Sequence, residues 1–164
     1  KVANKFIKKE NINNIIKENK FEGEIGILSI DIDGNDYWIW NEIEIVNPEI
    51  VIIEYNARLG SKLSLTIPYK RNFNRMKNKK KNNYGASLNA LNKLAEKKGY
   101  QLVGTNSNGN NAFFVRKDKI QNSKIQTREP NQCFNFNSFS EDKNENGKIN
   151  KEINNFDYSD FIEI

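Results

Sequence analysis

The chain has 164 residues, which is enough for one domain with a hydrophobic core and too few for two ordinary domains. It contains no histidine and a single cysteine, Cys133, which excludes Ser-His and Cys-His nucleophile pairs, histidine-ligated metals and an internal disulfide. No apolar run approaches the roughly 20 residues that a transmembrane helix needs, and the lone cysteine suits a reducing compartment, so we expect a cytoplasmic protein without a membrane span.

The formal net charge of +5 comes from one segment. Ten of the 26 lysines and arginines lie in residues 57–95, which contain no acid, so the rest of the chain holds 16 basic residues against all 21 acidic ones. Positive charge that is confined to one segment argues against nucleic-acid binding by the protein as a whole. The run Lys79–Lys81 leaves open a loop that binds RNA or another anion, although a solvated loop is the simpler interpretation.

The first predicted helix covers residues 10–19, because Ile12, Ile15 and Ile16 fall on one helical face. A short isoleucine-rich run, residues 25–32, follows as a buried strand. A second helix is predicted over 36–46, where Asn47 and Pro48 would stop it, and residues 50–56 form a second buried strand.

The second half of the chain begins with a long connection, residues 57–83, of the kind that usually serves as a functional loop or an insert. A leucine stripe predicts a helix over 87–98 that ends at Gly99. Two strands, 100–105 and 111–116, flank a tight-turn signal and so predict a hairpin. The alternation of helices and strands indicates an α/β fold with a mainly parallel sheet and one antiparallel strand.

We expect two regions: residues 1–117 as the folded α/β part, and residues 118–164 as a polar, largely irregular tail.

The candidate site residues follow the first two predicted strands. Asp31 and Asp33 sit at alternate positions at the end of the first strand, followed by Asn35 and Asp36. Parallel sheets bind their ligands at the carboxyl ends of the strands, so these residues are placed where a site would be. The alternative is a turn that caps the next helix, since Asp, Gly and Asn serve both purposes.

Further polar residues are expected at the same edge of the sheet. Glu54, Tyr55 and Asn56 end the second strand, and Tyr84 precedes the third predicted helix. We predict that Tyr55, Asn56 and Tyr84 contact substrate together with Asn35 and Asp36.

Four segments resemble the carboxyl-terminal half of the S-adenosylmethionine-dependent methyltransferases, in a family related to the FkbM-type enzymes. They are LSIDIDGNDYW at 28–38, IVIIEYNA at 50–57, YGASLNALNKLAEKKGYQLVG at 84–104 and NAFFVRKD at 111–118. The resemblance implies a partial Rossmann-like sheet whose strands correspond to strands 4, 5, 6 and 7 of that fold, in the spatial order 4-5-7-6 with strand 7 antiparallel.

The resemblance also implies a function. It implies methyl transfer from S-adenosylmethionine to a small hydroxylated acceptor such as a sugar or glycan oxygen, with Asp31 or Asp33 taking the acceptor proton. The glycine-rich turn and the ribose-binding acid of that fold have no counterpart in this sequence, so we expect the donor site upstream of Lys1. Strand 25–32 would then be an unpaired edge that contacts the missing half or a second copy.

In some catechol-type methyltransferases, residues at the ends of the corresponding strands bind magnesium. The residues of this chain in comparable places are Asp31, Glu54 and Asn56. A hydrogen-bonded turn network without a metal is the favoured interpretation here. The competing functions are a non-catalytic remnant or binding module on the same scaffold, and anion or RNA binding through residues 57–95.

Overall fold

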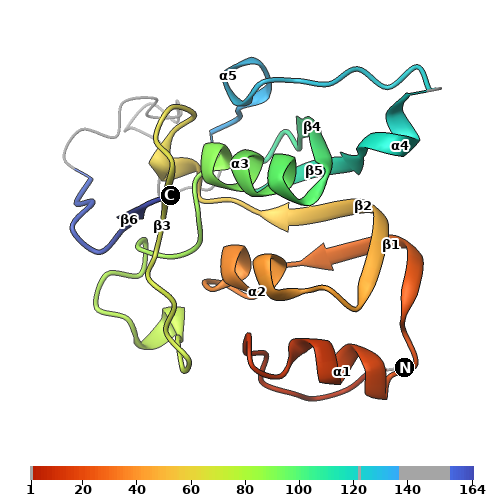
Figure 1. Cartoon of the computed structure of the whole chain (residues 1–164). Coiled ribbons are helices and arrows are strands. Elements are labelled where there is room, and N and C mark those ends of the chain that lie inside the picture. The colour runs from red at the N-terminus through yellow and green to blue at the C-terminus, as the bar shows by residue number, and fades with distance from the viewer. Residues whose placement is uncertain (1, 122, 137–155) are drawn as a thin grey trace.

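The computed structural model describes residues 2–121, 123–136 and 156–164 (Figure 1). The main sheet has four strands in the spatial order β1-β2-β5-β4, namely β1 (Gly23–Ile30), β2 (Val46–Glu54), β5 (Asn111–Arg116) and β4 (Tyr100–Thr105). β1 and β2 are parallel, whereas β5 runs antiparallel to both of its neighbours. The predicted α/β class, the four strands and the antiparallel hairpin strand are therefore confirmed.

Three main helices accompany the sheet: α1 (Ile12–Glu18), α2 (Asp36–Glu42) and α3 (Leu88–Lys98). Figure 1 shows α2 and α3 on the same face of the sheet. α3 begins and ends where the sequence predicts, because the Ser87 side chain accepts a hydrogen bond from the Ala90 amide and Gly99 takes the left-handed conformation, with φ 88°.

The hydrophobic core lies between α2 and α3 and the face of the sheet that these two helices cover. Leu28, Val51, Phe114 and Leu102 form one row across the four strands, and Val51, Phe114 and Leu102 are almost fully buried. Trp40 of α2 packs on this row with its ring centroid 5.1 Å from that of Phe114. Side chains on the opposite face of the sheet remain more exposed, as the 61% exposure of Ile27 shows.

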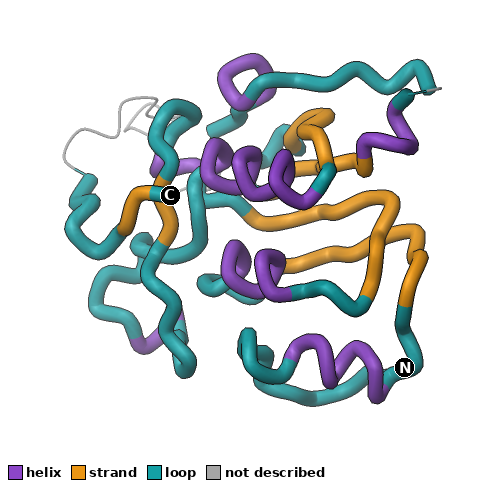
Figure 2. Tube along the Cα trace, in the orientation of Figure 1, coloured by secondary structure: helices purple, strands orange, loops and turns teal. Residues whose placement is uncertain are grey.

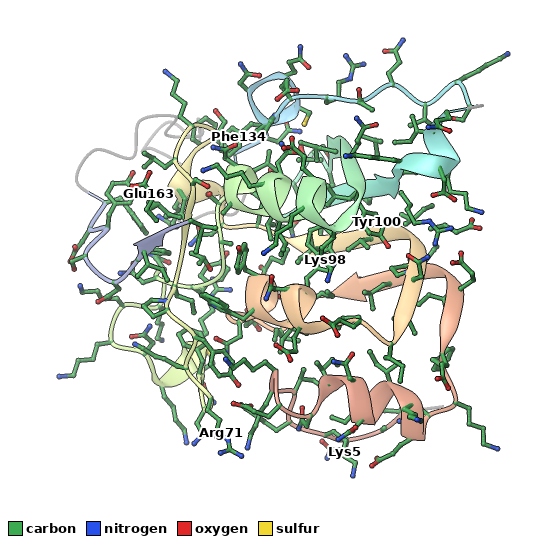
Figure 3. All side chains as sticks on the ribbon, in the orientation of Figure 1. Lys5, Arg71, Lys98, Tyr100, Phe134 and Glu163 are labelled. Carbon is green, nitrogen blue, oxygen red and sulfur yellow. The ribbon has the colours of Figure 1, made fainter. Side chains whose placement is uncertain are left out.

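The second helix is shorter than predicted: α2 ends at Glu42, not at Val46. The apolar pattern continues through Ile43, but contacts from distant residues end the helix. Asn13 of α1 donates to the Glu42 carbonyl and accepts from the amides of Glu44 and Ile45. Lys98, which Figure 3 places between α3 and the end of α2, donates to the carbonyls of Asn41 and Ile43.

Pro48 was expected to stop the helix, and instead lies inside β2 opposite Ile25. Its carbonyl oxygen accepts a hydrogen bond of 2.7 Å from the Tyr100 hydroxyl of β4. β1 ends at Ile30, two residues before the predicted end of the strand, because the chain turns at Asp31–Asp36.

The long connection contains three short elements: the 3-10 helices η1 (Ala57–Leu59) and η2 (Arg75–Lys77), and β3 (Leu65–Thr66). β3 pairs antiparallel with β6 (Ile162–Glu163), so the C-terminal residues return to this loop, as Figure 2 shows.

The predicted irregular tail is partly structured where it is described. It contains α4 (Lys117–Ile120), α5 (Pro130–Cys133) and β6, and Phe134 packs against Tyr55 with 6.0 Å between ring centroids. Residues 122 and 137–155, to which the prediction of an irregular tail also applied, lie outside the described residues. None of the described helices has the length and apolar character that crossing a membrane requires.

Candidate functional site

Three carboxylates gather at the carboxyl ends of β1 and β2. The strands are parallel neighbours with Ile30 opposite Ile53, so Asp31 and Glu54 directly follow paired positions. Asp33 follows Asp31 by two residues in the same turn, and after burial and the charge of Asp36 the charges of both aspartates act on Glu54 and raise its pKa. The structure thus brings both predicted catalytic aspartates next to Glu54.

Glu54 is the buried member of this cluster, with 8% of its surface exposed. Its Oε2 atom has no hydrogen-bond partner among the described residues. Burial, followed by repulsion from Asp36, Asp31 and Asp33, raises the pKa of Glu54 to about 8. A carboxyl group with a pKa near neutrality can both take up and release a proton, which is the requirement for acid–base catalysis.

Asp31 and Asp33 are the exposed members, and they differ in their contacts. Asp31 accepts no hydrogen bond from a described side chain or amide, and partial burial and then the charge of Asp33 raise its pKa. Asp33 is held by Arg75, whose Nη1 atom lies 2.8 Å from the Asp33 Oδ1 atom. Asp31 is therefore the more available carboxylate, and Asp33 anchors the arginine.

Arg75 is the functional candidate that the sequence analysis did not find. Its guanidinium carbon lies 3.7 Å from the ring centroid of Tyr84, and its Nε atom donates to the Lys81 carbonyl. Tyr84 is buried, and burial followed by repulsion from Glu54 raises its pKa. Arg75 is 42 residues away from Asp33 in a segment that holds nine other basic residues, so nothing local distinguishes it.

Asp36 and Asn35 build the turn rather than face solvent. Asp36 is fully buried, and its carboxylate accepts hydrogen bonds from the amides of Ile32 and Gly34 at 2.9 and 2.8 Å. Burial raises the pKa of Asp36 to about 6 despite these bonds. Asn35 donates to the Lys70 carbonyl, which ties the turn to the long connection.

Gly34 lies directly under the ring of Phe73, another residue of the long connection, so a Cβ atom at position 34 would overlap that ring unless the ring moved.

Asn56 and Tyr55 are engaged inside the protein as well. The Asn56 amide nitrogen donates to the carbonyls of Asn82 and Tyr84, and its oxygen accepts from the Arg58 amide. Tyr55 is fully buried, and its hydroxyl donates to the Asn135 carbonyl. Alternation along the strand directs Tyr55 away from Glu54 and Asn56, a signal that the sequence pattern already contained.

None of the side chains of Asn35, Asp36 and Asn56, which were predicted to contact substrate, is free of internal hydrogen bonds. Their partners are backbone amides and carbonyls. Nor does any group of three or more histidine, cysteine or acidic side chains in the described ranges have an arrangement that could hold a metal ion.

No family model matches the chain, and no curated protein or solved structure is detectably similar to it.

Proposed function

We propose that this chain is part of an S-adenosylmethionine-dependent methyltransferase, in which the carboxylate pair of Glu54 and Asp31 takes the single proton of an acceptor hydroxyl. The observation that carries the proposal is the placement of both carboxylates at the ends of adjacent parallel strands, where a buried Glu54 oxygen has no partner in the part of the chain that the structure describes. The strand order β1-β2-β5-β4 with β5 antiparallel is the order that the family resemblance implies, which supports the same assignment.

The arrangement suits proton transfer. A general base works best when its pKa lies near the working pH, and the pKa of Glu54, about 8, meets that condition. The charge of Arg75, held between Asp33 and the ring of Tyr84, lies beside the carboxylates and helps to orient a polar acceptor. A sugar or glycan oxygen as acceptor rests on the resemblance alone.

The test uses the full-length gene product, a methyl-labelled donor and a panel of sugar acceptors. We expect Glu54→Gln and Asp31→Asn to reduce kcat by about 10²–10⁴-fold, the usual contribution of a general base, while the Kd for the donor stays unchanged. Asp118→Asn, which removes an exposed partner of Arg116, is the matched control. Full activity in both site variants would refute the proton-transfer role, and the absence of labelled product with every acceptor would favour a non-catalytic binding module.

A separate prediction concerns the donor. Because the side chains of Asn35 and Asn56 are already hydrogen-bonded within the protein, calorimetry on the 164-residue chain alone should show no tight S-adenosylmethionine binding. Each buried polar group of a ligand that is left unpaired costs about 1–3 kcal/mol, so two or three such losses weaken binding by several powers of ten. Micromolar binding to this chain would contradict our placement of the donor site.

A further inference from the structure

A cavity of about 780 Å³ lies between the long connection and the C-terminal segment. Its wall contains Asp33 and Arg75, so it adjoins the carboxylate cluster described above. The remaining charged residues of the wall are Lys79, Lys80, Lys81 and Asp157. Four basic and two acidic side chains thus leave the cavity with an excess of positive charge.

The four basic residues differ in how their charge is compensated. Arg75 is paired with Asp33, and Lys80 lies 2.6 Å from an Asp157 oxygen and 3.3 Å from an Asp160 oxygen. The ammonium groups of Lys79 and Lys81 form no ion pair with any residue in the described ranges. The uncompensated charge of the cavity therefore belongs to these two lysines.

The cavity already holds one anion, the carboxylate of Asp157. Besides the contact with Lys80, this carboxylate accepts a hydrogen bond from the Ser159 amide, and Lys80 and Ser159 hold the pKa of Asp157 far below its usual range. The segment that carries Asp157 is anchored independently, because β6 pairs with β3 and Lys93 donates to the Ile164 carbonyl. Lys80 of the cavity wall therefore already pairs with a carboxylate.

We propose that this cavity binds the phosphate or carboxylate group of a small-molecule ligand, with Lys79 and Lys81 as the primary contacts and Asp157 as an internal competitor. Ammonium groups that line the same cavity suit a compact anion with several oxygens. A single-stranded nucleic acid would need a groove with successive aromatic platforms, and Phe156 is the one aromatic residue among the described residues that line the cavity. The inference does not rest on methyl transfer.

The test is calorimetry of the intact chain with inorganic pyrophosphate and, separately, with citrate, which distinguishes a phosphate from a carboxylate ligand. We expect the double change Lys79→Gln and Lys81→Gln to weaken binding by about tenfold or more, the effect of losing a charged hydrogen bond. Lys77→Gln is the matched control, because Lys77 belongs to the same loop but lines a different cavity. It should leave the Kd unchanged.

Removing a negative charge from the cavity wall should have the opposite effect on anion binding. Asp157→Asn removes the competitor and should strengthen pyrophosphate binding, a result that a purely structural role of the segment does not predict. Asp160→Asn is the second variant, because Asp160 contacts Lys80 but does not line the cavity. Equal weakening in the Lys77 control, no response to the double lysine change, or binding of single-stranded RNA without binding of either pyrophosphate or citrate would each overturn the proposal.

Discussion

At the scale of the residue, the surroundings of Glu54 set it apart from the other acids of the site. Asp33 is compensated by Arg75, and Asp36 by two backbone amides, whereas one oxygen of Glu54 is buried without a partner among the described residues. An uncompensated buried carboxylate favours its protonated form, so the folded chain holds a proton that the unfolded chain releases. The same property makes Glu54 suitable for proton transfer and costs stability.

The pH dependence of stability follows from this difference. Between pH 4.5, the ordinary value, and about 8, the folded chain binds more protons at Glu54 than the unfolded chain, so the free energy of unfolding falls as pH rises. The slope is at most about 1.4 kcal/mol per pH unit. The Glu54→Gln variant has no ionisable group at this position. Its free energy of unfolding, measured by urea denaturation, should therefore change less between pH 6 and 8.5 than that of the original chain.

Two comparisons make this prediction specific. Asp36, whose pKa is raised to about 6, also lowers the free energy of unfolding as pH rises, but mainly below pH 6. It is present in both the original chain and the Glu54→Gln variant. Glu18→Gln, at an exposed position of α1, is the control and should behave like the original chain. If the Glu54 variant loses stability with pH as steeply as the original chain, Glu54 is not the titrating group.

At the scale of the element, α2 is ended by its neighbours. Asn13 of α1 makes three hydrogen bonds to the last residue of α2 and to the residues that follow it, and Lys98 of α3 makes two to carbonyls at the same end. These bonds satisfy carbonyls that the end of a helix leaves without partners, and two amides of the chain that follows. They also hold α1 and α3 against α2, so the end of the helix is a joint between three elements.

The adjacent residues Asn13 and Asn14 offer a matched pair of substitutions at this joint. Asn13→Ala should lower the free energy of unfolding by about 1–3 kcal/mol, because backbone groups at the end of α2 lose their partners. Asn14 is exposed, so Asn14→Ala should leave stability unchanged or raise it slightly through the better helix propensity of alanine. Equal effects in a urea titration would show that Asn13 does not act through these bonds.

At the scale of the whole molecule, β1 is an edge strand of the main sheet with an apolar sequence. Ile27 is 61% exposed, and Ile50, Ile52 and Phe113 on the same face of the sheet are only partly buried. An apolar edge presents unpaired backbone groups to other strands, and protein surfaces rarely leave such residues in contact with water. We therefore expect copies of this chain to associate through β1.

Sedimentation of the chain over a range of concentrations tests this association. Ile27→Lys should shift the chain towards monomer, because a lysine on an edge strand opposes pairing and places charge on the apolar face. Met76→Lys adds the same charge at an exposed loop position and should leave the association unchanged. A chain that stays monomeric at every concentration would contradict the prediction.

The sequence by itself determined the features that depend on neighbouring residues. Periodicity predicts the four strands and the three main helices, Ser87 and Gly99 delimit α3, and the residues at 106–110 form the expected turn between β4 and β5. It also placed Asp31 and Asp33 at the end of a strand. Each of these features depends on a stretch of about ten residues, so the backbone preferences and the side-chain alternation within that stretch are sufficient to predict it.

Only the tertiary structure decided the features that join distant residues. α2 ends at Glu42 because Asn13 and Lys98 supply its partners, and Arg75 becomes a site residue because its loop folds back onto Asp33 and Tyr84. The raised pKa of Glu54 likewise depends on which residues exclude water from it. Such contacts arise from the packing of separate elements, so no local pattern in the chain records them.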